Sequence, residues 1–225
     1  MALAALLTAV PAAAGLGEIT FRTVDGWTIH GDYSAVRGAT KAVVLLHQRG
    51  GSAADWRPLV ASLNAAGLAT LAIDQRGAGR SVGPGNGVDA PWNTSNDIAG
   101  AVAWLGGKGF TAARIGLAGA SYGANNALIY ASAHPGISAV ALLSPGANYH
   151  GLVAAPAAAH YGGAILVLTA RDDPVTGGGP EAIAKVHTRG TMQLVTYGGS
   201  VHGTGLLTSN TGSLRLLTDF FRRRL

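Results

Sequence analysis

The chain has 225 residues, a length that suits one domain with a single large hydrophobic core better than two domains. Charged residues make up only 12% of the chain and glycine occupies 34 positions, a composition that excludes a disordered segment and a coiled coil. The net charge is +5, and the C-terminal run Arg222, Arg223, Arg224 holds three of the positive charges, so no basic face for nucleic acid is expected.

The N-terminal run from Met1 to Gly15 is apolar and ends in the Ala-x-Ala pattern of a secretory leader, but it lacks a basic first region. We therefore expect residues 1–17 to be a leader remnant or an extra N-terminal segment, followed by one catalytic domain over residues 18–225. The protein would be secreted or periplasmic if the leader is genuine, and cytoplasmic otherwise. No run of apolar residues is long enough to predict a transmembrane segment.

After this segment, Glu18 to Tyr33 alternates between apolar and polar residues around Asp25-Gly26, which predicts an antiparallel hairpin. Short runs that are almost wholly apolar then recur along the chain, as is typical of buried parallel strands. These runs are Ala42–Leu46, Ala69–Ile73, Arg114–Ala118, Ala139–Leu143, Ala164–Leu168 and Met192–Val195.

Amphipathic or helix-capable stretches separate these runs. The first has Asp55 as a candidate N-cap. The alternation of strand and helix predicts an α/β fold with a mostly parallel, doubly wound sheet of about eight strands. The expected helices are Asp55–Ala66, Ser95–Leu105, Ser121–Ala133, Glu181–His187 and Ser213–Arg224.

In such sheets ligands bind at the carboxyl ends of the parallel strands, so the residues after each apolar run are candidates for chemistry. The motif Gly-x-Ser-x-Gly, which permits a tight turn from strand to helix, occurs twice, around Ser121 and around Ser81. Only Ser121 follows an apolar run and begins a helix-capable stretch, so we expect it to be the nucleophile.

A serine nucleophile needs a histidine as base and a carboxylate to orient that histidine. His202 lies in a glycine-rich loop after the last predicted strand, and Asp172-Asp173 is a carboxylate pair that follows another strand. We favour Asp173 as the acid, with Asp172 as a competitor. The order Ser121, Asp173, His202 is the nucleophile–acid–histidine order of α/β-hydrolases.

Over residues 18–225 the chain resembles the α/β-hydrolase superfamily, close to its dienelactone-hydrolase-like and bacterial carboxylesterase branches. Dienelactone hydrolases proper use cysteine, which this chain lacks. The resemblance implies the α/β-hydrolase fold with an N-terminal hairpin. The motifs that carry it are LLHQRGGS (45–52), IDQRGAGRS (73–81), GASYG (119–123), ARDDPVT (170–176) and GGSVHG (198–203).

By the same resemblance, the backbone N–H groups of Tyr122 and Arg49 would form the oxyanion hole. Gln48 replaces Arg49 as donor if the loop register differs. The family's usual His-Gly is His47-Gln48 in this chain, so the choice between Arg49 and Gln48 stays open. The segment around Asp74 and Arg76 is interpreted as scaffolding of a tight loop.

Only Pro145–Tyr161 separates the two predicted strands between which many relatives insert a cap, and such a length is too short for a cap domain. We expect an open cleft lined by Tyr122, Trp92, Tyr149 and His150. Its uncharged character favours a neutral carboxylic ester, a small-molecule substrate.

No metal or organic cofactor is expected. Without cysteine the chain can form neither disulfides nor thiolate metal sites. The glycines at Gly77 and Gly79 lack the third glycine of a dinucleotide-binding motif, and Gly107-Lys108 lacks the remainder of a P-loop.

The sequence therefore predicts a serine esterase that works through an acyl-enzyme on Ser121. The alternatives are another acyl-transfer enzyme of the same fold, namely an amidase, a peptidase or a perhydrolase, and a non-catalytic binding protein. The natural substrate and the oligomeric state stay open.

Overall fold

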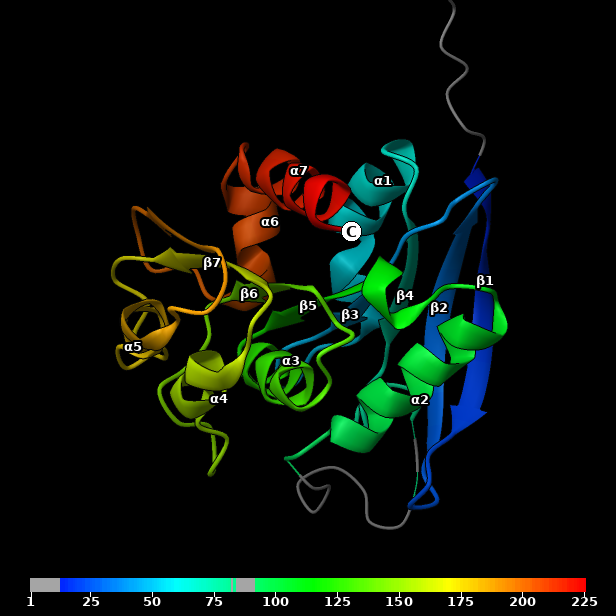
Figure 1. The fold of residues 1–225 in the computed structure, drawn as a ribbon, viewed down its shortest axis with the longest axis horizontal. Helices are drawn as coiled ribbons and strands as arrows, with labels where there is room; N and C mark the ends of the chain where they lie inside the picture. Colours follow the sequence, from blue (N-terminus) through cyan, green and yellow to red (C-terminus); the bar gives the residue numbers. More distant parts are fainter. Residues whose placement is uncertain (1–12, 82, 84–91) are drawn as a thin grey trace, which may run out of the picture.

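A computed structural model describes residues 13–81, 83 and 92–225. The strands form one sheet in the order β1-β2-β4-β3-β5-β6-β7-β8 (Figure 1). From β4 to β8 all neighbouring strands are parallel, and this confirms the predicted doubly wound sheet of eight strands. The strands are β1 (Ala13–Arg22), β2 (Thr28–Val36), β3 (Ala42–Leu46), β4 (Ala69–Ile73), β5 (Ile115–Ala120), β6 (Ala139–Leu143), β7 (Ala164–Ala170) and β8 (Met192–Tyr197).

The N-terminal hairpin forms the antiparallel edge of the sheet, as predicted. β1 pairs with β2 from Ala13↔Val36 to Arg22↔Thr28, and β2 then pairs antiparallel with β4. Residues 13–17 thus contribute backbone pairing to β1. Residues 1–12 of the expected N-terminal segment lie outside the described part of the chain.

Helices cover both faces of the sheet, with α1, α6 and α7 on one face and α2 to α5 on the other (Figure 1). None of the described helices is long and apolar enough to cross a membrane. Their bounds are α1 (Arg57–Ala65), α2 (Ser95–Gly107), α3 (Tyr122–Ala133), α4 (Ala154–His160), α5 (Gly179–Val186), α6 (Leu206–Ser209) and α7 (Ser213–Arg224), with short 3₁₀ turns η1 (Ala53–Trp56), η3 (Ala112–Arg114) and η4 (Gly203–Gly205).

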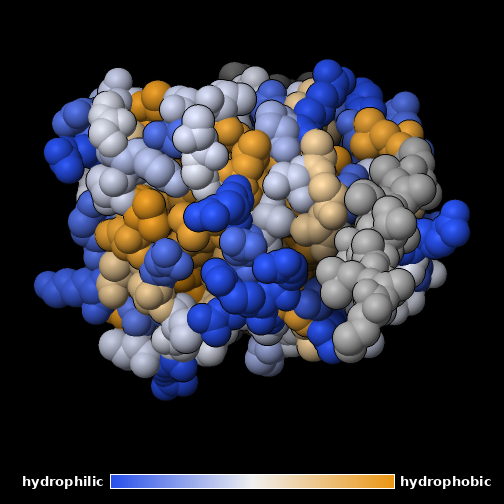
Figure 2. Space-filling model, turned by 90° about the horizontal axis from the view of Figure 1, so that it is seen from above, coloured by the Kyte–Doolittle hydropathy of each residue, from blue (hydrophilic) through white to orange (hydrophobic). Residues whose placement is uncertain are grey.

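The central strands are apolar throughout because each packs against helices on both faces. In β3, Val44 and Leu46 belong to the core beneath α2 and α3, whereas Val43 and Leu45 belong to the core beneath α1 and α7. Figure 2, seen from the side of α1 and α7, shows apolar patches separated by hydrophilic side chains. Because alternate residues of the strands belong to different clusters, the two hydrophobic cores lie between the sheet and its two helical layers.

The start of the first helix differs from the prediction. The expected helix 55–66 is divided into η1 and α1, and Asp55 is not its N-cap. The Asp55 carboxylate instead accepts the N–H of Ser52 at 3.1 Å, as the third residue of a capping box. Pro58 lies at the start of α1, where a missing N–H costs nothing.

The connection between β6 and β7 contains α4, a helix of seven residues that the sequence did not predict. Residues 144–163 form this whole connection, and it includes no cap domain, as expected. This connection therefore places no cap domain over the carboxyl ends of the strands.

Candidate active site

Ser121 lies on a strained turn between β5 and α3. Its φ of 55° is in the left-handed region, which residues other than glycine rarely adopt. The turn is fixed because the Ser121 N–H donates to Leu143 O at 2.8 Å, and Ser121 O accepts the N–H of Ala124 at 2.9 Å. Backbone strain of this kind costs about 1–3 kcal/mol and concentrates at functional sites.

The two glycines of the motif are required by close backbone contacts. A Cβ on Gly119 would lie 2.3 Å from the Gly123 carbonyl oxygen. A Cβ on Gly123 would lie 2.5 Å from Leu46 O and 2.6 Å from His47 O, at the end of β3. The first turn of α3 can therefore approach β5 and β3 only with glycine at both positions.

The second copy of the motif has a different structure. Ser81 is buried, and its hydroxyl donates to the Asp74 carbonyl oxygen and accepts the N–H of His30 at 2.9 Å. Ser81 is thus a structural residue that joins a loop to β2, as its sequence context indicated.

The segments expected to supply the oxyanion N–H groups are the start of α3 and the turn after β3. Tyr122 is the first residue of α3, where N–H groups lack partners within the helix and the helix dipole is positive. Opposite it, Gln48 O accepts the N–H of Gly51 at 3.0 Å, which closes a turn with Gly50 at φ 76°. This turn contains Arg49, the other expected donor.

The structure brings His202 and Asp173 together. His202 Nδ1 lies 2.7 Å from Asp173 Oδ2. The Asp173 side chain is fully buried and the imidazole is 23% exposed. Asp173 Oδ1 also accepts the N–H of Val175 at 3.0 Å, so both carboxylate oxygens are engaged. Asp172, the competing candidate, is exposed to solvent.

The histidine loop lies beside the end of β5. A Cβ on Gly203 would lie 3.7 Å from Ala120 Cβ, directly before Ser121. Within the described residues no hydrogen bond joins Ser121 to His202. The Tyr149 hydroxyl lies near Ser121 and donates to Ser144 O at 3.5 Å. Catalytic hydrogen bonds are often long without substrate and shorten when it binds.

His47 links two loops of the site. Its Nε2 accepts the N–H of Gln75 at 2.9 Å, so the proton must be on Nδ1, which donates to Gln48 O at 2.7 Å. Burial lowers the pKa of His47, because a desolvated imidazole is more stable when neutral. His47 therefore positions the Gln48–Gly51 turn as a neutral side chain.

Asp74 and Arg76 hold the loop after β4. The Asp74 carboxylate accepts hydrogen bonds from the Ala53 N–H at 2.7 Å and from the Arg80 Nε–H at 2.7 Å. Although burial acts to raise it, these hydrogen bonds lower the pKa of Asp74 overall. Arg76 donates from Nη2 to Asp97 at 2.7 Å and from Nη1 to Asp25 at 2.7 Å. These contacts agree with the scaffolding role inferred from the sequence.

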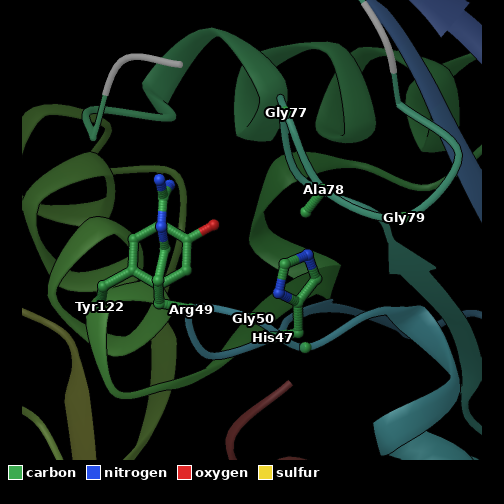
Figure 3. A pocket seen from close by; sticks show the side chains of 8 residues that line it. His47, Arg49, Gly50, Gly77, Ala78, Gly79 and Tyr122 are labelled. Carbon is green, nitrogen blue, oxygen red and sulfur yellow. The ribbon is translucent and has the colours of Figure 1, made fainter. Parts of the chain in front are cut away.

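A cavity of about 280 Å³ lies between the Gln48–Gly51 turn and the loop after β4 (Figure 3). Arg49 and Tyr122 line one side of it, and His47 and Ala78 line the other. Burial raises the pKa of Tyr122, so its hydroxyl stays neutral at physiological pH. Both residues expected to supply oxyanion N–H groups thus also contribute side chains to this cavity.

The expected cleft-lining residues are placed as follows. Trp92 stacks on His150 with ring centroids 3.8 Å apart, and its edge meets Tyr122 at 5.9 Å. The Arg49 guanidinium lies 4.3 Å from the Trp92 ring. Tyr149 covers Gly146 and reaches Ser121. Trp92, His150 and Tyr122 are therefore neighbours, and Tyr149 is next to the candidate nucleophile.

Two contributions were missed from the sequence. Ser144 directly follows β6, and its hydroxyl accepts the N–H of Gly203 at 3.0 Å. Gln48 was considered only as a backbone donor, yet its side chain accepts the N–H of Thr204 at 2.8 Å. The position of Ser144 at a strand end was a signal, but no sequence pattern identified either contact.

The described residues contain no cluster of three or more His, Asp or Glu side chains that could hold a metal ion. His202 and Asp173 contact each other, and Asp74 contacts backbone groups and Arg80. The polar side chains of the site therefore have protein partners.

Comparison with protein families gives one match. The family described as serine aminopeptidase, S33, matches residues 38–165, which is more than half of the chain. This range includes the loops around His47 and Asp74 and the turn at Ser121. No curated protein matches the sequence significantly.

Solved structures share the fold. The esterase Pf2001 of Pyrococcus furiosus has 19% identity and a TM-score of 0.79, covering 93% of each chain. A dienelactone hydrolase from Anabaena variabilis has 21% identity and a TM-score of 0.71, covering 96% of this chain and all of that one. The enol-lactonase of Burkholderia xenovorans has 16% identity and a TM-score of 0.73, covering 90% of this chain and 99% of that one. At these identities the likeness concerns the fold.

The contacts of Gly123 predict that Gly123→Ala destabilises the protein by about 1–3 kcal/mol or more, because the new Cβ would overlap backbone at the end of β3. Gly106→Ala is the matched control: this exposed residue of α2 has nothing within 4 Å of its Cβ position, so alanine should stabilise the helix by about 0.5–1 kcal/mol. Urea unfolding measures both. Equal effects of the two changes would contradict the close approach.

The lowered pKa of His47 predicts a dependence of stability on pH. Below the ordinary pKa of 6.5 the unfolded chain binds a proton at His47 that the folded chain does not, so the free energy of unfolding should fall as pH decreases. The slope contributed by His47 is at most about 1.4 kcal/mol per pH unit. Urea unfolding at pH 7.5 and 5.5 measures it. His47→Asn should reduce the fall and His160→Asn, at an exposed site, should not.

Proposed function

Because the chain belongs to the serine aminopeptidase S33 family and is a hydrolase of the α/β-hydrolase superfamily, we propose that it cleaves short-chain, neutral carboxylic esters through an acyl-enzyme on Ser121. The observation that carries the proposal is the pair His202–Asp173, with Nδ1 and Oδ2 2.7 Å apart, at the same edge of the sheet as the strained turn at Ser121. This combination suits nucleophilic catalysis.

In the proposed mechanism, Asp173 fixes the imidazole with its proton on Nδ1, which leaves Nε2 free to act as a base. Ser121 Oγ attacks the ester carbonyl carbon, and His202 Nε2 accepts the hydroxyl proton. The tetrahedral intermediate collapses, the C–O bond to the alcohol breaks, and His202 returns the proton to the departing alcohol. Water then attacks the acyl-enzyme by the same route and releases the acid.

The oxyanion would be stabilised by backbone N–H groups. The Tyr122 N–H at the start of α3 is one donor. The turn from Gln48 to Gly51 supplies the other, from Arg49 or, if the substrate lies in the alternative register, from Gln48. One such donor lowers the barrier by about 3–4 kcal/mol. The neutral His47 beneath the turn keeps this donor in place before substrate arrives.

A peptidase or amidase is the second candidate, because the matched family is described as a serine aminopeptidase. An aminopeptidase needs a carboxylate that receives the substrate's amino group. Near the cavity, the carboxylates of Asp74 and Asp97 are hydrogen-bonded to Arg80 and Arg76. The similar structures include an esterase and an enol-lactonase. Of the described residues near the cavity, neither carboxylate is thus left for an amino group, and both observations favour an ester; a perhydrolase would use the same three residues.

A series of p-nitrophenyl esters from acetate to long-chain acyl groups tests the substrate. We expect hydrolysis to peak at short acyl chains, on the proposal that the cavity of about 280 Å³ beside the Gln48–Gly51 turn holds the acyl group. Ser121→Ala should abolish turnover with an unchanged unfolding midpoint. Folded wild-type protein that cleaves no ester but cleaves amino-acyl p-nitroanilides would favour the peptidase instead.

The two adjacent aspartates provide a matched comparison for the acid. Asp173→Asn should reduce kcat by about 10⁴-fold, because the amide favours the wrong tautomer of His202. Asp172→Asn, at the exposed neighbour, should leave kcat within about twofold, as surface changes usually do. The measurement is the steady-state rate on the best ester. Similar mild losses in both variants would contradict the assignment of Asp173.

A further inference from the structure

Two consecutive backbone N–H groups directly after His202 are held by side chains from other loops. The Gly203 N–H donates to Ser144 Oγ at 3.0 Å, and the Thr204 N–H donates to Gln48 Oε1 at 2.8 Å. The Thr204 hydroxyl lies 3.2 Å from the same Gln48 oxygen. These residues begin η4, whose first N–H groups have no partner within the turn. Gln48 and Ser144 therefore act as caps supplied from outside the segment.

The two side chains come from opposite sides of β5, the strand that ends directly before Ser121. Gln48 lies just after β3, and Ser144 lies just after β6. In the sheet order, β3 and β6 are the two neighbours of β5. The backbone next to His202 is thus held from both sides of Ser121. His202 is the N-cap residue of η4 but makes no capping bond itself, and its ring instead contacts Asp173.

The fit of Gln48 against this backbone is tight. Gly203 has φ 56°, and a Cβ built on it would lie 1.9 Å from Gln48 Oε1. The amide oxygen of Gln48 therefore occupies the space that any side chain at position 203 would need. A glycine at position 48 could not make this contact.

Ser144 is held in a strained backbone conformation. It is fully buried and has φ 50°, one of three non-glycine residues with positive φ in the described chain. Its N–H donates to Leu168 O at 2.8 Å, which fixes the backbone so that Oγ faces Gly203. Strain of this kind persists where the surroundings require one geometry.

We propose that Gln48 and Ser144 are positioning residues that fix the His202 backbone relative to Ser121. The inference rests on the proposed function, in which His202 takes a proton from Ser121. Asp173 sets the tautomer and orientation of the ring, but a hydrogen bond at Nδ1 leaves the ring free to move with its loop. The two caps fix the loop itself. A displacement of about 1 Å between reacting groups can reduce a rate by about 10²-fold.

The test measures covalent labelling of Ser121 by a fluorophosphonate, followed by mass spectrometry of the intact protein, together with kcat and KM on the best ester. Gln48→Leu and Ser144→Gly should each lower the labelling rate and kcat by about 10- to 100-fold, with KM unchanged. The double variant should lose less than the product of the two single losses, because both act through one loop.

Three further variants separate positioning from general stability. Ser144→Gly relieves the positive φ and Ser144→Ala keeps it, so glycine should raise the unfolding midpoint above that of alanine while both lose the same rate. Gln48→Glu keeps an acceptor for the Thr204 N–H and should recover most of the rate lost in Gln48→Leu. Gln193→Leu, at an exposed position on β8, is the matched control and should leave the rate within about twofold.

The outcomes are distinguishable. If wild-type Ser121 is not labelled and no ester is cleaved, the proposed function fails. If wild type is labelled but Gln48→Leu and Ser144→Gly react as fast as wild type, the positioning role is overturned. The positioning role is also overturned if the rates of the Gln48 and Ser144 variants follow their unfolding midpoints. In that case Ser144→Gly, the more stable variant, would react faster than Ser144→Ala.

Discussion

The close approach of α3 to the ends of β3 and β5 is the constraint on which the rest of the site depends. Glycine at 119 and 123 permits it, and the result is Ser121 at φ 55° with its backbone tied to Leu143. This turn places the serine at the edge of the sheet and directs the first N–H groups of α3 to the same place. Because the contact is between backbones, side-chain repacking cannot relieve it.

The surroundings of this turn are built from polar groups that already have partners. His47 is neutral and hydrogen-bonded at both ring nitrogens, and the carboxylate of Asp74 joins η1 to Arg80. Arg76 is held between Asp97 and Asp25. Removing one member of such a buried network leaves an unpaired charge or donor, which costs more than the bond itself contributes. Among the described residues, these hydrogen bonds fix the loops around His47 and Asp74 without a bound substrate.

The sequence predicted the fold well because the relevant signals are local. Each predicted apolar run became a strand, and the central strands β3 to β7 are apolar at nearly every position because they are buried on both faces. The predicted ends of strands and helices were less accurate where a glycine or a polar side chain changes the local hydrogen bonding. β5 continues to Ala120 through a glycine, and the expected helix at Asp55 became η1 because its carboxylate bonds to Ser52. The short helix α4 was not predicted, because its alanine-rich sequence has no clear amphipathic pattern.

The sequence by itself determined the strand and helix alternation, the turn at Ser121 and the loops that contain Asp173 and His202, because these depend on residue types at short spacing. Only the tertiary structure decided that Asp173 rather than its exposed neighbour contacts His202, and that Gln48 and Ser144 hold the following backbone. Those contacts join residues up to 156 positions apart in the chain. They depend on sheet order and on the angle at which each loop leaves its strand, and no local pattern records either.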